Sequence, residues 1–164
     1  MVQRWQVRVQ EQDFDPGTEI NSLQASSAGA LASFVGIARD RSDGFAVERI
    51  TLEHYPGMTE RCLQDIVAQA AARFELLDAC VVHRHGRLQP GDRIVLVATA
   101  STHRDAAFEA CRFIVDYLKT EAPFWKQESG PAGTRWVAER DSDERARMRW
   151  EQLHRGPMKS PHEG

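Results

Sequence analysis

Two lysines seven positions apart are the clearest candidates for chemistry in this chain of 164 residues. The segment DYLKTEAPFWKQE, at positions 116–128, contains Lys119 and Lys126. In an uninterrupted helix both would lie on one face, about 10 Å apart along the axis. Pro123 prevents that helix, because its ring clashes with the carbonyl group four positions earlier. We therefore expect the helix to end near Thr120 and the next residues to be extended.

The two aromatic residues that follow the proline, Phe124 and Trp125, indicate how the second lysine is held. Large aromatic side chains are costly to expose, so both are expected to pack the returning chain against the body. Two lysines on such supports could bind one anion together, or one could lose its proton and act as a base or nucleophile. The spacing alone favours two solvated surface lysines, which are commoner.

Three further cations lie at the ends of predicted elements. Arg39 ends the segment GALASFVGIAR and enters a loop, and loops carry function disproportionately. His103 and Arg104 begin a predicted helix, whose free N–H groups and partial positive charge favour anions. Ser101 or Thr102 is expected to cap that helix. Taken alone, these residues are explained better by a charged strand end and a capped helix with solvent-facing side chains.

Other common chemistries are not indicated. The three cysteines, Cys62, Cys80 and Cys111, form no CxxC pair and occupy apolar positions, so neither a zinc site nor a disulfide framework is expected. The sequence contains no glycine-rich phosphate loop, Ser-His-Asp pattern or metal-ligand spacing, and no metal or cofactor is predicted. The segment HRHGR, at 83–87, resembles a basic patch, but alternation on a strand predicts a solvated strand face.

Composition places the chain among ordinary soluble proteins, with 41% hydrophobic and 27% charged residues. A net charge of −3 argues against bulk binding of nucleic acid, which usually requires a basic domain. The beginning of the chain, MVQRWQVRVQ, lacks the apolar core of a signal peptide, and no apolar run approaches the ~18 residues of a membrane span. These features predict a cytoplasmic protein.

Hydrophobic periodicity predicts the elements that position the candidate residues. Helical spacing of apolar residues predicts long helices over 59–74 and 104–120. The apolar segment 29–39 predicts a strand covered on both faces. The other expected elements are strands at 4–9, 47–54 and 134–140, a hairpin around QPGD, a loop at DRSDGFA and a short helix at 19–24. This set predicts one α+β domain over 1–150 and a mobile polar tail at 151–164.

Several blocks, in one order, resemble the MoaE family, the large catalytic subunit of molybdopterin synthase. These blocks are LEHYPGMTE, HRHGRLQPGD, STHRDAAFEACRFIVDYLKTEAPFWKQE and RWV, within about Gly29 to Trp150. The resemblance implies an α/β hammerhead-type fold with a small additional antiparallel β subdomain. It also implies a homodimer that binds small ubiquitin-like sulfur-carrier subunits, giving a heterotetramer.

The activity implied by the resemblance is sulfur transfer. The C-terminal glycine thiocarboxylate of the carrier would enter the site and deliver sulfur to cyclic pyranopterin monophosphate. Two such transfers would make the dithiolene of molybdopterin, a step of molybdenum cofactor biosynthesis, so the chain is expected to be a sulfurtransferase. The alternative is a non-enzymatic module that binds a ubiquitin-like tail or a phosphorylated ligand through the same cations.

The resemblance also assigns residues. Lys119 matches the essential lysine and Lys126 a second catalytic lysine, while Arg39 matches an anion-binding arginine. The expected substrate-binding positions are Ile37, Ala38, Arg39, His103, Arg104, Lys119, Lys126, Gln127 and Glu128, with His103 and Arg104 coming from the dimer neighbour. Many members of the family have a basic residue where this chain has Gln127, and this difference affects only a secondary contribution to the charge of the site. The cations would neutralise a cyclic phosphate and a thiocarboxylate in one pocket.

Overall fold

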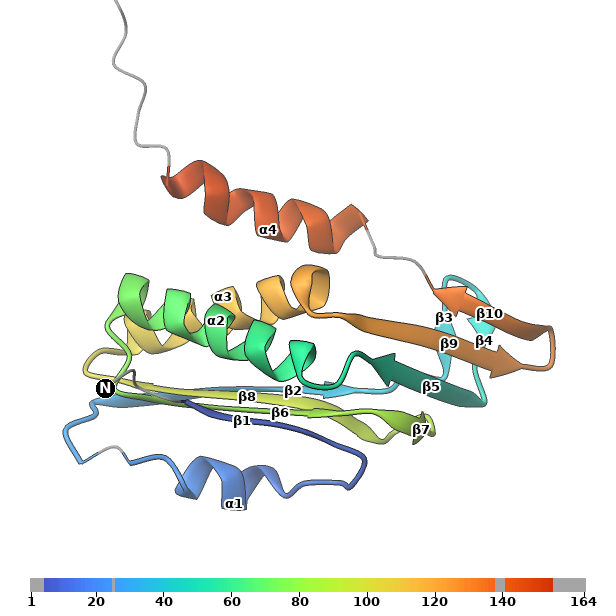
Figure 1. Cartoon of the computed structure of the whole chain (residues 1–164), viewed down its shortest axis with the longest axis horizontal. Coiled ribbons are helices and arrows are strands. Elements are labelled where there is room, and N and C mark those ends of the chain that lie inside the picture. The colour runs from blue at the N-terminus through green and yellow to red at the C-terminus, as the bar shows by residue number, and fades with distance from the viewer. Residues whose placement is uncertain (1–4, 25, 138–140, 155–164) are drawn as a thin grey trace, which may run out of the picture.

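A four-stranded sheet forms the base of the molecule (Figure 1). The computed structural model describes residues 5–24, 26–137 and 141–154. In spatial order the strands are β1 (Gln6–Gln10), β6 (Asp78–Arg84), β8 (Arg93–Ser101) and β2 (Ala30–Ile37). β1 runs parallel to β6, and the other neighbours are antiparallel. The predicted hairpin between β6 and β8 is confirmed, with Gly91 at a φ of 92° and an Asp92 N–H that donates to the Gln89 carbonyl oxygen, 3.0 Å away.

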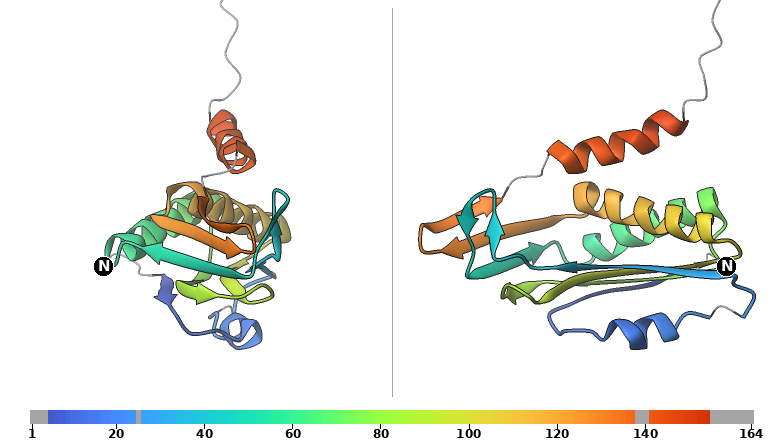
Figure 2. Two further views of the ribbon diagram at one scale, coloured as in Figure 1. Left: turned by 90° about the vertical axis from the view of Figure 1, so that its right-hand side faces the viewer. Right: turned by 180° about the vertical axis from the view of Figure 1, so that it is seen from behind.

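Two long helices cover one face of this sheet, and a short helix lies on the other (Figures 1 and 2). α2 (Met58–Phe74) and α3 (Arg104–Glu121) confirm the two predicted amphipathic helices. Their apolar stripes meet the sheet in a core of fully buried side chains that includes Leu63, Ile66, Val67, Ile114, Val81 and Val97. Burial of such stripes, rather than helix propensity, provides most of a helix's stability in a protein.

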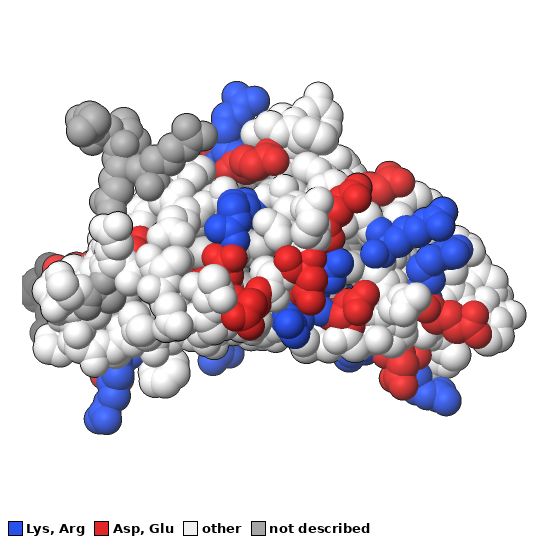
Figure 3. Space-filling view, turned by 90° about the horizontal axis from the view of Figure 1, so that it is seen from below, with Lys and Arg blue, Asp and Glu red and all other residues white. Residues whose placement is uncertain are grey.

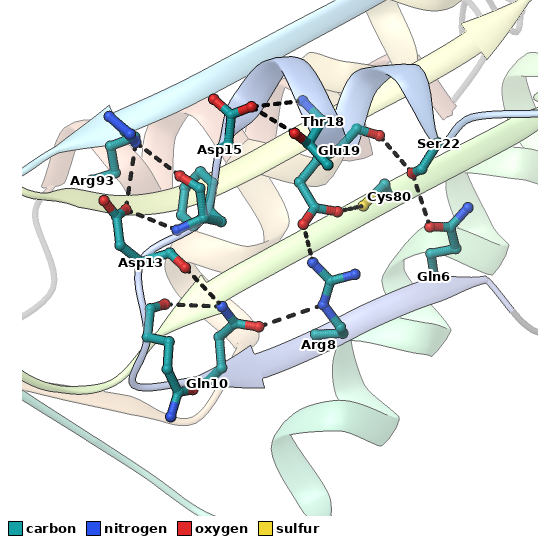
Figure 4. A network of polar contacts seen from close by, with 12 residues as sticks. Gln6, Arg8, Gln10, Asp13, Asp15, Thr18, Glu19, Ser22, Cys80 and Arg93 are labelled. Carbon is teal, nitrogen blue, oxygen red and sulfur yellow. Dashed lines mark hydrogen bonds and ion pairs between the residues drawn. The ribbon is translucent and has the colours of Figure 1, made fainter.

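The short helix α1 (Pro16–Asn21) begins three residues earlier than expected, because Asp15 caps it. The Asp15 carboxylate accepts from the Thr18 N–H at 3.1 Å, and proline is favoured at the first helical position. A network of polar contacts holds α1 across the sheet, including an ion pair between Arg8 and Glu19 (Figure 4). Beneath α1 lies a second apolar cluster, formed by Phe14, Leu23, Cys80, Val82, Leu96, Ala98 and Ala100.

The sequence predicted that the strand at 29–39 is covered on both faces, and for β2 this prediction is wrong. Leu31 and Ile37 are each 49% exposed, because β2 is an edge strand and the described residues leave part of its outer face open. On the face of the molecule seen from below, acidic and basic side chains are interspersed (Figure 3). That face has no broad basic region of the kind that binds nucleic acid.

A second antiparallel sheet extends beyond the end of the first (Figure 1). Its strands, in spatial order, are β10 (Gly133–Val137), β9 (Phe124–Gly130), β5 (Arg49–His54) and β7 (Gly86–Leu88). The segment predicted to be a loop at DRSDGFA instead contains a small hairpin of β3 (Arg41–Ser42) and β4 (Phe45–Ala46). The α+β class and the additional antiparallel β subdomain are therefore confirmed.

The C-terminal part of the described chain forms a helix, α4 (Asp141–His154), which lies along α3 (Figure 1). Trp150 anchors it: this side chain is 3% exposed and contacts the rings of Phe74 and Phe113 edge-on. Its Nε1–H donates to an Asp116 carboxylate oxygen at 2.7 Å. The helix thus includes residues 151–154 of the predicted tail, and 155–164 lie outside the described residues. No helix in the described part of the chain is long and apolar enough to cross a membrane.

Candidate functional site

A cavity of about 530 Å³ lies where the end of α3, the start of β9 and the loop after β2 meet. Four cationic side chains line this lysine cavity: Lys119, Lys126, Arg39 and Arg41. Of the other predicted substrate-binding residues, Ile37, Ala38 and Glu128 also line it. The structure therefore brings the two lysines of the opening motif to one cavity, although helix and strand separate them in the chain.

The local sequence explains this convergence. α3 ends at Glu121, and Ala122 has an extended backbone with φ −70° and ψ 133°, as expected before Pro123. Lys119 consequently lies in the last turn of α3, where a cation interacts favourably with the helix dipole. β9 then begins at Phe124 and carries Lys126 back along β5, opposite Leu52.

Strand alternation separates the three candidate residues of β9. Lys126 and Glu128 line the cavity, whereas Gln127 between them does not; Trp125, near the start of the strand, lines it as well. Phe124 is packed as predicted, with its ring stacked on His83 at a centroid distance of 3.7 Å. The prediction that Trp125 is buried is wrong, because this side chain is 50% exposed.

His83 is a residue of the cavity wall that sequence reasoning missed. The predicted solvated strand face is wrong here: His83 is 6% exposed, because β6 lies between β1 and β8 and Phe124 covers its end. Burial, together with the nearby Lys119 charge, lowers the pKa of His83 to about 4. A hydrogen bond from Nδ1 to the Arg84 carbonyl oxygen, at 2.8 Å, acts in the opposite direction. The imidazole is therefore neutral at neutral pH.

Glu128 belongs to an ion pair that holds two parts of the second sheet together. Its carboxylate is 2% exposed and accepts from Arg135 Nη2 at 3.0 Å and from Nε at 3.3 Å. Arg135 Nη2 also donates to the Ser42 carbonyl oxygen at 2.9 Å, and the guanidinium lies 4.3 Å from the centre of the Phe45 ring. Gly130 permits this docking, since a Cβ there would come within 2.0 Å of the Ala46 carbonyl oxygen. A role of Glu128 in binding substrate stays a prediction.

The two arginines of the cavity follow β2 in a fixed backbone segment. The Ala38 N–H donates to the Asp92 carbonyl oxygen at 2.9 Å, and the Val47 N–H donates to the Asp40 carbonyl oxygen at 2.8 Å. Arg39 and Arg41 are exposed, and neither side chain makes a hydrogen bond or ion pair with another described residue. Both also line an adjoining cavity of about 610 Å³. The sequence signal for Arg41 was its position two residues after Arg39, in the same loop after the strand.

His103 and Arg104 lie at the other end of α3, and the structure of a single chain does not bring them to the lysine cavity. Arg104 and Lys119 are about 22 Å apart along the helix axis, at 1.5 Å per residue. The predicted cap is also wrong: His103 is the N-cap residue, and Ser101 is the last residue of β8, with its hydroxyl near the Glu75 carbonyl oxygen at 3.4 Å. Thr102 is exposed and makes no capping bond.

The cysteines do not line the lysine cavity. Burial raises the pKa of Cys80 and of Cys111 to about 12, and it also raises the pKa of the less buried Cys62. Since the thiolate is the nucleophilic form, none of these thiols is activated at neutral pH. In the described part of the chain no three His, Cys, Asp or Glu side chains are grouped to hold a metal ion.

Replacing Arg135 should destabilise the protein through Glu128. Arg135→Met leaves a buried carboxylate without its cation, and we expect the free energy of unfolding in urea to fall by about 3 kcal/mol. Adding Glu128→Gln should recover much of this loss, because the double variant buries no charge. A double variant as unstable as the sum of the two single variants would contradict a direct interaction.

The buried His83 should make stability depend on pH. Its folded pKa of about 4 lies below the unfolded value of 6.5, so the unfolded chain binds more protons between these values. Stability is thus complete above about pH 6.5 and falls by about 3 kcal/mol at most as pH decreases towards 4. Urea unfolding at about pH 7 and about pH 5 should show a smaller loss for His83→Gln than for the unchanged protein. Equal losses would show that His83 titrates normally.

Known proteins match this chain over most of its length. The family model described as "MoaE protein" matches residues 9–121. A "Molybdopterin synthase catalytic subunit" from Ralstonia nicotianae is 58% identical over 146 residues, which are 88% of this chain and 83% of the relative. A solved structure of the "Molybdopterin biosynthesis MoaE protein" from Burkholderia ambifaria has a TM-score of 0.78 and 49% identity, covering 90% of this chain and 98% of that one.

A more distant solved structure is described as a protein–protein complex of subunits 1 and 2 of molybdopterin-converting factor from Helicobacter pylori. It has a TM-score of 0.65 and 18% identity, covering 82% of this chain and 91% of that one, and so supports the fold alone. The family match and the 58% identity, each over well more than half of the chain, agree with the resemblance stated from the sequence blocks. This chain belongs to the MoaE family.

Proposed function

We propose that this chain is the catalytic subunit of a molybdopterin synthase. In this proposal it transfers sulfur from the C-terminal thiocarboxylate of a small ubiquitin-like carrier subunit to cyclic pyranopterin monophosphate. The observation that carries the proposal is the meeting of Lys119 and Lys126 with Arg39 and Arg41 in one cavity. The relatives' names point to the same reaction. A cytoplasmic location stays a prediction.

The charges of the lysine cavity suit two anionic reactants. Its two carboxylates are already paired, Glu128 with Arg135 and Glu121 with Arg147, at 3.0 and 3.5 Å. Among the described residues of the lining, the four cations outnumber the two carboxylates, which suits a cyclic phosphate and a thiocarboxylate. Arginine forms forked hydrogen bonds with phosphate oxygens, so Arg39 and Arg41 are suited to the phosphate, and the lysines to the carrier tail.

In the proposed reaction the thiocarboxylate sulfur forms a bond to a carbon of the pterin precursor as a carbon–oxygen bond of that carbon breaks. The oxygen leaves as water or remains on the phosphate as its ring opens. Water then attacks the acyl carbon of the resulting thioester, the acyl–sulfur bond breaks, and the carrier leaves as a carboxylate while the sulfur stays on the product. A second carrier repeats these steps for the second sulfur. Lys119 would donate to the acyl oxygen, where negative charge develops during the attack of water, and such fixed donors are a major source of catalysis.

The protein's own thiols are poorly suited to act as sulfur donors. Cys80 and Cys111 are buried, and the pKa of each is raised to about 12. Cys62 lies outside the cavity lining, with its sulfur 3.5 Å from the Glu121 carbonyl oxygen. An external sulfur carrier is therefore the arrangement that this chemistry favours.

A dimer would complete the cavity in this proposal. His103 and Arg104 are exposed at the N-terminus of α3, far from Lys119 of the same chain. The half-exposed Leu31 and Ile37 of β2 offer apolar surface that a second copy could cover. If α3 of that copy approaches the cavity by its N-terminus, its His103 and Arg104 add two donors for the substrate's anion.

Removing the Lys119 amine should abolish sulfur transfer. With thiocarboxylated carrier and cyclic pyranopterin monophosphate, we expect Lys119→Ala to lower the rate of dithiolene formation by at least about 100-fold. Replacing Cys62, Cys80 and Cys111 together by Ser should leave transfer largely intact. A well-folded triple variant without activity would contradict the external source of sulfur, and carrier binding without any turnover by the unchanged protein would favour the non-enzymatic module.

Mixed dimers should show whether Arg104 acts across the dimer. A dimer of one Lys119→Ala chain and one Arg104→Ala chain contains one doubly defective site and one intact site if Arg104 serves the neighbour. Such a heterodimer, purified with two different tags, should have about half the activity of the unchanged dimer. Near-zero activity, with both parent variants also inactive, would show that Arg104 serves its own chain.

A further inference from the structure

His83 uses one ring nitrogen for the fold and leaves the other open to the lysine cavity. Nδ1 lies 2.8 Å from the Arg84 carbonyl oxygen, so Nδ1 carries the proton and Nε2 keeps an unshared electron pair. Nε2 has no hydrogen-bond partner among the described residues. It is also not fully buried, so solvent or a ligand can reach it. Because His83 lines the cavity, Nε2 is open to a ligand there.

Two contacts fix the orientation of this ring. The bond to the Arg84 carbonyl oxygen sets its rotation, and stacking on Phe124, at 3.7 Å and an interplanar angle of 16°, sets its plane. Phe124 is also the first residue of β9, the strand that carries Lys126. The open nitrogen is thus held in a constant position relative to the second lysine, as a binding group must be.

The electrostatic surroundings keep Nε2 unprotonated. Lys119 of α3, His54 of β5 and His85, which follows β6, are near enough that the positive charge of each disfavours a proton on the His83 ring. With burial, these groups lower the pKa of His83 to about 4. Between about pH 5 and 8 the imidazole is therefore a neutral hydrogen-bond acceptor.

Few side chains of this cavity offer a free acceptor. Arg39, Arg41, Lys119 and Lys126 can only donate hydrogen bonds. The carboxylates of Glu128 and Glu121 are paired with arginines. The cations fit anionic groups of a ligand but cannot recognise an N–H or O–H group. A pterin ring carries N–H groups, and a buried acceptor that is left unpaired costs binding free energy.

We infer that His83 is a substrate-binding residue whose Nε2 accepts a hydrogen bond from an N–H or O–H group of the pterin part of the substrate. The cations would hold the phosphate and the carrier tail, and His83 would set the orientation of the ring system between them. This inference rests on the proposed function and adds to it a residue that selects the substrate by its donor groups.

Two substitutions separate the two nitrogens of His83. The side-chain amide of Asn can still donate to the Arg84 carbonyl oxygen but cannot reach the position of Nε2, whereas the Gln carbonyl oxygen can. With saturating carrier, His83→Asn should raise the KM for cyclic pyranopterin monophosphate about 3- to 10-fold and change kcat less. His83→Gln should restore most of the affinity, and the affinity for the carrier should be unchanged in both variants.

His85→Asn is the matched control, because His85 lies two residues away but does not line the cavity. Its KM should equal that of the unchanged protein. The KM of His83→Asn divided by the KM of the unchanged protein should stay constant between about pH 5.5 and 8, because His83 does not titrate in this range. An unchanged KM in His83→Asn, or an equal rise in His85→Asn, would overturn the inference.

A measurement on the unchanged protein covers the case in which the variants do not fold. With ¹⁵N-labelled histidine, the NMR signal of His83 Nε2 should move upfield when cyclic pyranopterin monophosphate is added without carrier, as for an imidazole nitrogen that begins to accept a hydrogen bond. A signal unchanged at a saturating concentration would overturn the inference. If the unchanged protein made dithiolene while this signal stayed fixed, only the role of His83 would be refuted. If the unchanged protein made no dithiolene with a functional carrier, the proposed function itself would be refuted.

Discussion

The arrangement of the site depends on the steric effect of one proline. Pro123 cannot continue α3, because its ring would overlap the carbonyl group one turn back and it has no N–H to donate. The chain must therefore leave the helix just after Lys119 and return as β9. This reversal brings a lysine from a helix end and a lysine from a strand into one cavity, which neither element could do alone.

The strand that follows imposes the second constraint, which is its two-residue period. Once Phe124 is stacked on His83, Lys126 and Glu128 lie on the same side of the strand and line the cavity, and Trp125, which also lines it, is left half-exposed. The buried carboxylate of Glu128 then requires a partner, because an unpaired charge at 2% exposure would be very costly. Arg135 is that partner, and the same guanidinium holds the Ser42 backbone and the Phe45 ring, so the hairpin that carries Arg41 is tied to the lysine strand.

These constraints sort the charged groups of the cavity by function. The acids are paired with structural arginines, while Arg39 and Arg41 have no partner in the described part of the chain. The thiols, in contrast, are held in their protonated form. A cavity that is rich in cations and lacks a nucleophilic thiol suits a protein that positions two anionic reactants and takes its sulfur from a partner.

The sequence alone determined the features that depend on neighbours along the chain. The helix stop before Pro123, the two amphipathic helices and the turn at Gly91 follow from ring sterics, a 3.6-residue period and a positive φ, all of which are local. The family blocks identified Lys119, Lys126 and Arg39 as candidates, and all three line one cavity. Only the tertiary structure decided the rest. The burial of His83, the pairing of Glu128 with Arg135 and the position of Arg41 result from strands that are distant in sequence, and whether a polar side chain is solvated or enclosed depends on those distant strands.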